Sequence, residues 1–315
     1  MALNTVLTTT SGISPTIQTY YDRKLLMNAK PNLAYYNYGQ QVVLPKNQGK
    51  TIQFRKWTPF GAMTTPLTEG VVPNGQSLAM TAVTADMKQY GGYVAVSDLL
   101  DLTAIDPVVN DSVELMGDQG GLTIDTIVRD AIAASTNVQY ADGKTARSQL
   151  SAATPLTVNE IRKAVRTLKN NKAPQFIREN KGYYVAIVGP NTTYDLQNDL
   201  LWQDVSKYSA AENIFDGEIG KLFGVVFVET TQAPMYAAQG LGAATVLATM
   251  VLGRNAYGVV DLEAANLRSI VKPRGSSGTA DPLDQISTVG WKVEGFACQV
   301  LQPLWMVRVE HGMTA

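Results

Sequence analysis

The stretch TPFGAMTTPLTEGVVPNGQSLAM, from Thr58 to Met80, decides the fold. It holds three prolines, three glycines and a single charged residue, Glu69. It is too irregular for a helix and too polar to fill a core, yet strand-like runs flank it at 51–57 (TIQFRKW) and 93–96 (YVAV). Loops longer than about 12–15 residues are usually functional or disordered. The sequence therefore predicts a long loop whose length needs a functional explanation.

The composition limits the classes of protein that the chain can belong to. The chain has 315 residues, of which 45% are hydrophobic and 17% are charged, and the charged share lies below the usual value of about 25%. A large surface with few charges indicates that other molecules cover much of it. The net charge of −1 provides no overall basic field for nucleic acid. A single cysteine, Cys298, excludes an intrachain disulfide and a cysteine-based metal site, and it fits synthesis in a reducing cytosol.

The N-terminal region is expected to be an arm. The chain contains no apolar run of about 18 residues, and its first residues lack the pattern of a signal peptide. Residues 1–15 are polar and rich in Thr, and residues 16–29 can form a short helix that stops before Pro31. Three tyrosines follow closely, and we expect them to pack on another surface, a neighbouring molecule being one option. These residues are Tyr35, Tyr36 and Tyr38.

A long helix is predicted over about 106–136. Asp106 suits the N-cap and Pro107 the first helical position. Apolar residues then recur every three or four positions, which gives one buried stripe on a helix of roughly 30 residues, about 45 Å long. Glycines near its middle predict a bend, a break or a close backbone approach; they are Gly117, Gly120 and Gly121.

A second unit, of mixed α/β type, follows a polar linker near 137–155. Thr157 and Glu160 have the spacing of a capping box and open one helix. A second helix is expected in NTTYDLQNDLLWQDVSKY, and buried-type strands in GYYVAIVGP, GVVFVETT, TVLATMVLG and AYGVVDLE. The chain closes with two alternating segments, around Val289–Val293 and Val307–Glu310, which predict antiparallel strands beside the long helix.

The sequence provides little support for a catalytic site or a metal site. The only histidine, His311, could pair with Cys298 as a nucleophilic dyad, but Cys298 lies in an apolar strand pattern that favours inert packing. One His and one Cys exclude the usual zinc ligand sets. Three aspartates before the long helix could hold a hard cation, although helix capping is the favoured interpretation; they are Asp98, Asp101 and Asp106.

Glycine-rich fragments do not complete a nucleotide-binding motif. GKT occurs at 49–51 and 143–145, but Leu44 and Val138 stand where a phosphate loop needs its first glycine. GLGAAT at 240–245 begins like a dinucleotide fingerprint, ends in Thr and follows no clear strand. We therefore expect no cofactor.

Basic residues gather in the helix that Thr157 opens and in the loop after it. This cluster could face nucleic acid, the acidic patch of a neighbouring subunit, or solvent alone. No aromatic residues interleave the charges, which disfavours a nucleic-acid platform. The principal members are Arg162, Lys163, Arg166 and Lys169.

Several long strings resemble the N4-type family of tailed-phage major capsid proteins. The matches run in order from about residue 19 to His311 and cover nearly the whole chain. They include TYYDRKLLMNAKPNLAYYNYGQ, LPKNQGKTIQFRKW, TPLTEGVVPNGQSL, KQYGGYVAVSDLLDLTAIDP, VGPNTTYDLQND, IGKLFGVVFVETT, VLGRNAYGVVDLE and VKPRGSSGTADPLDQISTVGWK.

The resemblance implies an α+β, HK97-like capsid fold. Its parts are an N-terminal arm, an extended β-hairpin loop with flanking strands, a peripheral domain with a long spine helix, an axial α/β domain, and returning strands that complete the peripheral domain. They map in this order to 1–50, 51–95, 96–154, 155–250 and 251–315.

The resemblance also implies a structural function without catalysis. Such a chain self-assembles into pentamers and hexamers of the icosahedral shell around double-stranded DNA, after synthesis in the host bacterial cytoplasm. Expected partners are a portal protein, a separate scaffolding protein, a decoration or cement protein and the packaged DNA, with no membrane. An encapsulin-like compartment is the alternative; a tail-tube protein and an enzyme with a lid fit less well.

The extended loop is then expected to become ordered on another copy of the chain. Its prolines stiffen it and its glycines permit a hairpin tip. Besides the three tyrosines, we expect charged residues of the loop to contact adjacent subunits; they are Arg55, Lys56 and Glu69.

Overall fold

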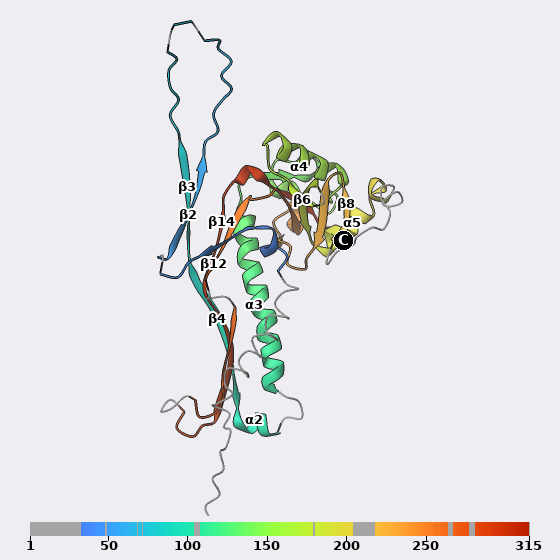
Figure 1. Cartoon of the computed structure of the whole chain (residues 1–315). Helices are drawn as coiled ribbons and strands as arrows, with labels where there is room; N and C mark the ends of the chain where they lie inside the picture. Colours follow the sequence, from blue (N-terminus) through green and yellow to red (C-terminus); the bar gives the residue numbers. More distant parts are fainter. Residues whose placement is uncertain are drawn as a thin grey trace, which may run out of the picture.

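A computed structural model describes residues 33–47, 49–67, 69–70, 72–103, 108–178, 180–203, 218–263, 267–276 and 281–314. The short helix expected at 16–29 lies outside these ranges, as do Asp106 and Pro107. Figure 1 shows three parts: an elongated body along helix α3 (Val108–Ala133), a long hairpin that projects beyond one end of the body, and a rounded lobe beside that end.

Helix α3 is the long helix that the apolar stripe predicts. It runs without interruption through 26 residues, and its buried face includes Val113, Met116 and Ile124. The glycines lie where the helix backbone comes close to its neighbours. A Cβ on Gly120 would lie 3.1 Å from Leu267 Cδ1 and 3.4 Å from Trp291 Cδ2. Gly120 therefore lets the helix lie directly on the sheet.

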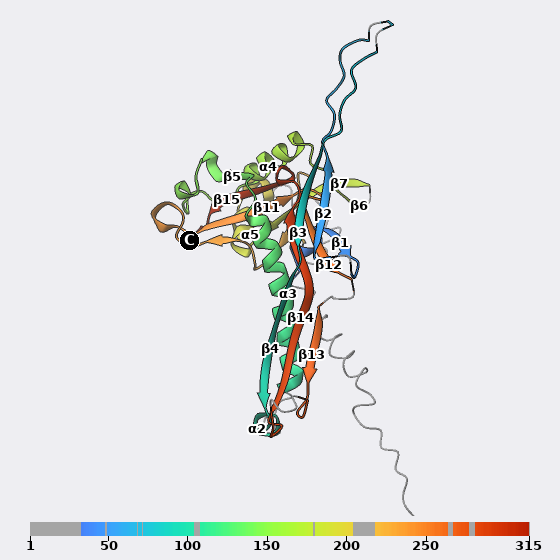
Figure 2. The same ribbon diagram turned by 90° about the vertical axis from the view of Figure 1, so that its left-hand side faces the viewer.

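The body is completed by a five-stranded sheet that packs against α3 (Figure 2). Its longest strand, β14, pairs antiparallel with β4, β12 and β13, and β1 adds in parallel to β12. The indole N–H of Trp291 donates a 2.9 Å hydrogen bond to Gln119 Oε1 of the helix. A short helix, α2 (Asp98–Thr103), follows β4. The strands are β1 (Gln40–Leu44), β4 (Lys88–Ser97), β12 (Tyr257–Leu262), β13 (Arg268–Lys272) and β14 (Ile286–Val300).

The projecting hairpin consists of β2 (Thr51–Trp57) and β3 (Met80–Asp86), which pair in register from Thr51↔Asp86 to Trp57↔Met80. The main-chain amide of Thr58 donates to the Ala79 carbonyl, which closes the ladder at the base of the loop. The range 51–95 was expected to contain the extended loop and its flanking strands. In the structure β3 ends at Asp86, and the next strand, β4, belongs to the body because it pairs with β14.

The lobe is built on an eight-stranded sheet with the order β5-β15-β11-β7-β9-β8. Helix α4 (Val158–Asn170) packs on one face of this sheet, and the C-terminal half of α3 packs on the other. Because both faces of the sheet are buried, its central strands consist of continuous apolar runs. The strands are β5 (Val138–Tyr140), β6 (Phe176–Arg178), β7 (Lys181–Val188), β8 (Glu218–Leu222), β9 (Val225–Glu229), β10 (Met235–Tyr236), β11 (Val246–Leu252) and β15 (Met306–Gly312).

One strand lies elsewhere than expected. Residues 251–315 were expected to return together to the peripheral domain, and β12, β13 and β14 do so. Strand β15 instead pairs with β11 and β5 in the lobe. The alternating residues of β15 are compatible with either sheet, so its local pattern does not predict which sheet it joins. Its pairing with strands distant in the sequence determines this.

Helix α4 of the lobe begins and ends where expected. Thr157 is the N-cap residue of α4, but its side chain makes no capping bond; Asp199 Oδ2 instead accepts from the amide of Val158 at 3.0 Å. The expected second helix is divided into α5 (Pro190–Gln197) and a further turn at 200–203. Short 3-10 turns occur at Tyr36–Tyr38, Ala141–Gly143, Arg147–Gln149, Leu241–Ala243 and Pro303–Trp305.

Candidate functional site

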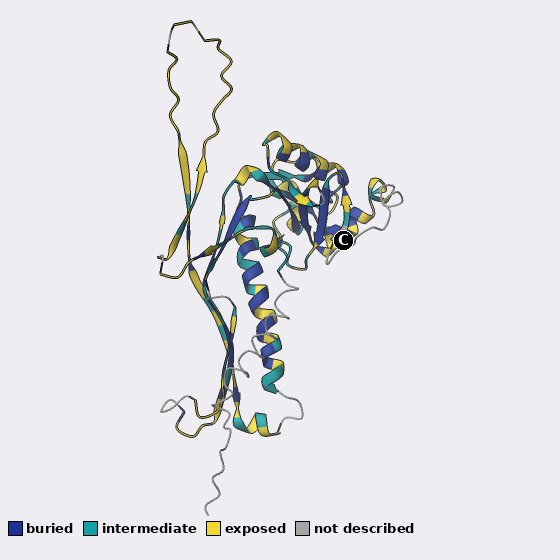
Figure 3. Cartoon of the chain, in the orientation of Figure 1, coloured by how far each residue is buried: buried dark blue, intermediate teal, exposed yellow. Residues whose placement is uncertain are grey.

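The loop of the hairpin presents a surface that the described part of the chain leaves uncovered. Every described residue of the loop between β2 and β3 is exposed (Figure 3). Val72 is 89% exposed and Leu67 is 74% exposed. Large apolar side chains in water are unfavourable, and exposed groups of them mark interaction sites. The exposed set is Trp57, Phe60, Met63, Leu67, Val72, Leu78 and Met80.

Sequence reasoning missed these apolar residues. It weighed the prolines, the glycines and the single charge, and it judged the stretch by its polarity. The signal was present, since a large apolar residue recurs every few positions from Trp57 to Met80. In a loop that joins two strands, such residues have no core of their own to enter.

The charged residues of the hairpin occupy two different settings. Arg55 and Glu69 are exposed. Lys56 bends back to the body, where its Nζ donates a 2.5 Å hydrogen bond to Gln302 Oε1 and lies 5.7 Å from the ring centre of Trp305. Lys56 therefore connects the base of the hairpin to the body, while Arg55 and Glu69 remain available to another molecule.

The base of the hairpin is also fixed by packing. The ring of Phe54 lies over Gly258 of β12, where a Cβ would approach Phe54 Cζ to 2.6 Å. Ile52 and Phe54 pack against a small cluster that includes Leu44 and Val260. The hairpin therefore leaves the body in a defined direction, because its root is anchored even though its length is exposed.

The three tyrosines pack within the subunit. Tyr35 is fully buried, its main-chain amide donates to Asp125 Oδ1 at 2.7 Å, and burial raises the pKa of its phenol. A fully buried side chain has no surface left for a neighbour, so the contact expected for Tyr35 is instead made inside its own chain.

The other two tyrosines are half-buried. Tyr36 donates its hydroxyl to Asp261 Oδ2, and its ring stacks on Phe296 at 6.3 Å between centres. Tyr38 meets Phe176 edge-on at 5.9 Å. Each ring thus has its main contacts within the chain, and only its remaining exposed edge is open to a neighbour.

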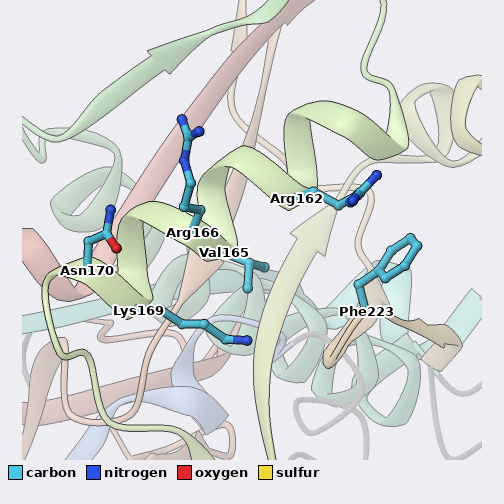
Figure 4. Close-up of a pocket in the computed structure, with 6 residues that line it drawn as sticks. All are labelled: Arg162, Val165, Arg166, Lys169, Asn170 and Phe223. Carbon is cyan, nitrogen blue, oxygen red and sulfur yellow. The ribbon is translucent and has the colours of Figure 1, made fainter.

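The basic cluster on α4 separates into two groups. Lys163 is half-buried and its Nζ lies 2.7 Å from Glu160 Oε1, so its charge is neutralised locally. Arg162, Arg166 and Lys169 are exposed, and the guanidinium of Arg162 lies 5.1 Å from the ring centre of Phe223. These residues line a surface hollow together with Val165, Asn170 and Phe223 (Figure 4).

The candidate catalytic pair is not brought together. Cys298 lies on β14 of the body, and burial raises the pKa of its thiol to about 12. His311 lies fully buried on β15 of the lobe, near the hydroxyls of Thr192 and Thr249. Burial lowers the pKa of His311 to about 4, so the imidazole is neutral at pH 7. A protonated thiol and a neutral imidazole in different sheets do not form a nucleophilic dyad.

The aspartates at α2 serve the fold. Asp98 Oδ1 accepts from the amide of Leu99 at 2.7 Å, and Asp101 Oδ2 lies 2.5 Å from Arg274 Nη2. Within the described ranges, no cluster of three or more His, Cys, Asp or Glu side chains has the arrangement of a metal site. The described helices also include none long and apolar enough to span a membrane.

The comparisons with known proteins agree with this architecture. A family model described as phage capsid protein matches residues 79–309. None of the curated proteins compared with the chain is significantly similar to it. The capsid of Ralstonia phage GP4 is similar with a TM-score of 0.69 at 12% identity, over 89% of this chain and 91% of that one. The Cyanophage Pam1 capsid gives 0.68 at 14% identity, over 87% and 89%, and the Cyanophage P-SCSP1u capsid gives 0.61 at 16% identity, over 88% and 86%.

Proposed function

Because the chain belongs to the phage capsid protein family and is a major capsid protein with an HK97-like fold that forms the shell, we propose that it assembles as pentamers and hexamers around double-stranded DNA. Within that family, the long strings in its sequence favour the N4-type group. The shell subunit acts by repeated association, since many modest interfaces in a closed assembly together give high stability.

The exposed apolar hairpin is the observation that carries this proposal. A two-stranded ribbon is marginal by itself in water, and this one carries a row of large apolar side chains, with Leu67 and Val72 the most exposed. Burial against the surface of an adjacent subunit removes that apolar area from water and orders the loop. Arg55 and Glu69 then form charged contacts at the edge of the same interface.

The family resemblance implies further partners for such a shell. We propose that a portal protein, a separate scaffolding protein, a decoration protein and the packaged DNA contact it, and that the subunit is made in the host cytoplasm. The hollow at Arg162, Arg166 and Lys169 suits an acidic segment of a neighbouring subunit. Phe223 and Val165 line it beside the charges, and such a mixture of apolar and cationic groups is typical of protein contacts.

A shortened hairpin tests the proposal. Replacing residues 58–79 with Asn-Gly joins Trp57 to Met80 through a two-residue turn that suits antiparallel strands. Size-exclusion chromatography with light scattering, followed by electron microscopy, should show shells for the wild type and small soluble species for the shortened variant. Circular dichroism should show that this variant is folded.

A charge reversal on the hairpin is compared with a charge added on the lobe. Arg55→Glu should weaken assembly, whereas Ile177→Lys, at an exposed apolar position of the lobe strand β6, should leave it unchanged. Shells formed equally well by the shortened variant would contradict the proposal. Shells from the host that contain a cargo protein in place of DNA would favour the encapsulin-like alternative.

A further inference from the structure

Helix α3 carries a second stripe, on the side away from the sheet. Residues at spacings of four, three, four and three lie on one face of a helix. Starting at Asp111, this spacing leads through Leu115, Asp118 and Leu122 to Asp125. The first four are exposed, with Leu115 at 67% and Leu122 at 38%, whereas Asp125 is fully buried. The stripe is therefore covered at one end and open along the rest.

The covered end shows what lies on the stripe. The amides of Tyr35 and Tyr36 donate to Asp125 Oδ1 at 2.7 and 3.1 Å. The main chain at the beginning of the described structure thus crosses the stripe at Asp125. One turn further, Arg129 donates to the carbonyl of Gln232 at 3.3 Å, so the loop around Gln232 occupies the C-terminal continuation. The open part is the N-terminal half, from Asp111 to Leu122.

We propose that residues 20–30 of the same chain bind the open half of this stripe. Two residues separate them from the described segment that begins at Leu33 and covers Asp125, so the contact would extend an existing one. From Asp125 to Asp111 the helix rises about 21 Å. Thirteen residues span up to about 43–47 Å when extended, so the segment before Leu33 is long enough to cover that distance.

The charged and apolar residues of the 20–30 segment match those of the stripe, which supports binding of this segment there. Residues 20–30 read YYDRKLLMNAK and carry Arg23, Lys24 and Lys30 against a single acid, Asp22. The stripe offers two exposed aspartates that alternate with two exposed leucines, and among the described residues no cation is paired with either aspartate. Lysine and arginine would meet Asp111 and Asp118, while Leu25 or Leu26 would cover the leucines.

The inference concerns the single subunit and does not rest on shell assembly. It divides the N-terminal arm into two parts. Residues 20–30 would remain on their own spine helix, and residues 1–19 would be left to reach other subunits. The spine helix would thereby set the point from which the arm departs.

Proteolysis of the full-length, unassembled subunit tests the contact. Chymotrypsin cleaves after Tyr20, Tyr21, Leu25 and Leu26, and mass spectrometry identifies each cut. We expect Asp118→Lys to accelerate cleavage by roughly three- to tenfold, because proteolysis follows the population of the open form. Asp86→Lys, the same charge reversal at an exposed position of the hairpin strand β3, should have no effect. Adding Arg23→Glu and Lys24→Glu to Asp118→Lys should restore protection.

A disulfide distinguishes the same chain from a second copy. Leu26→Cys combined with Leu122→Cys should form an intrachain disulfide that runs as a monomer on a non-reducing gel. Leu26→Cys combined with Ile177→Cys, on the lobe, should not. Formation of dimers only would assign the stripe to a second copy and overturn the proposal. Equal cross-linking in both pairs, or equal cleavage of wild type and Asp118→Lys, would also overturn it.

Discussion

The main-chain amide of Tyr35 donates a 2.7 Å hydrogen bond to Asp125 Oδ1, across 90 residues of sequence. The amide of Tyr36 shares the same oxygen, and the hydroxyl of Tyr257 donates to the carbonyl of Tyr35. One buried carboxylate thus joins the start of the described chain to the spine helix, and Tyr257 ties both to strand β12. The start of the described chain is therefore held against the spine helix at this point.

Asp125→Ala is expected to destabilise the subunit by about 2–3 kcal/mol, because it leaves two buried amides without an acceptor. Asp125→Asn keeps an acceptor oxygen and removes the buried charge, so its loss should be under about 1 kcal/mol. Urea denaturation at pH 7, with an unchanged dependence on denaturant concentration, measures both. Equal losses for the two variants would contradict the role given to the acceptor.

The pH dependence of stability should contain two opposing contributions. Burial raises the pKa of Asp125 from 3.8 to about 6, so between these values the folded state holds more protons and the free energy of unfolding falls as pH rises. Burial also raises the pKa of Asp261, so this carboxyl group likewise lowers the free energy of unfolding as pH rises. Burial lowers the pKa of His311 from 6.5 to about 4, so its contribution rises with pH over that window. The wild type should therefore show a shallow dependence between pH 4 and 6.5.

Single variants should separate these contributions. His311→Gln leaves the carboxylates, and its free energy of unfolding should fall from pH 4 to pH 6. Asp125→Asn leaves the histidine, and its free energy of unfolding should rise over the same range. The fall in His311→Gln should be on the order of 2–3 kcal/mol. The rise in Asp125→Asn should be smaller, because Asp261 still opposes the contribution of the histidine. Denaturation series at several pH values measure the slopes, and slopes of the same sign in both variants would refute this assignment.

Glu310 is expected to be the most sensitive charged residue of the lobe. Its buried carboxylate lies 2.7 Å from Arg147 Nη2 and 2.8 Å from Arg308 Nε. Glu310→Ala leaves two arginines without their partner and should cost about 3–5 kcal/mol. Glu294→Ala breaks a more exposed pair with Arg268 and should cost no more than about 1 kcal/mol. Thermal or urea unfolding compares the two, and a similar loss would argue against the buried pair.

Gly120→Leu should destabilise the body by about 1–3 kcal/mol, because the side chain would enter the space held by Leu267 and Trp291. Gly75→Leu is the matched control, since a Cβ at that position meets nothing within 4 Å. Its stability should be close to that of the wild type in urea. A stabilised Gly120→Leu would show that helix propensity outweighs the close contact.

Local patterns predicted the main elements. The apolar stripe gave the long helix to within three residues at each end, Val108–Ala133 against 106–136, because helix periodicity is a short-range property. The prolines and glycines between Thr58 and Met80 correctly indicated a loop outside any core. The buried runs of the lobe were recognisable as strands for the same reason.

Contacts between residues that are distant in the sequence determined the features that local patterns could not predict. The main-chain amide of Tyr35 is bonded to Asp125 across 90 residues, and Glu310 is paired with Arg147 across 163 residues. Strand β15 joins the lobe through β11, although its alternation suits either sheet. No local pattern contains these partners. Of the candidate site, Arg55 and Glu69 are exposed in the single subunit, and their contacts with adjacent subunits stay a prediction. Lys56 instead contacts Gln302 of its own chain.

A cryo-electron microscopy reconstruction of the assembled particle tests the central claim most directly. The account predicts rings of five and six subunits in which Leu67 and Val72 of each hairpin lie buried against an adjacent subunit. A closed shell whose hairpins extend into solvent, with these side chains as exposed as they are in the single subunit, would contradict it.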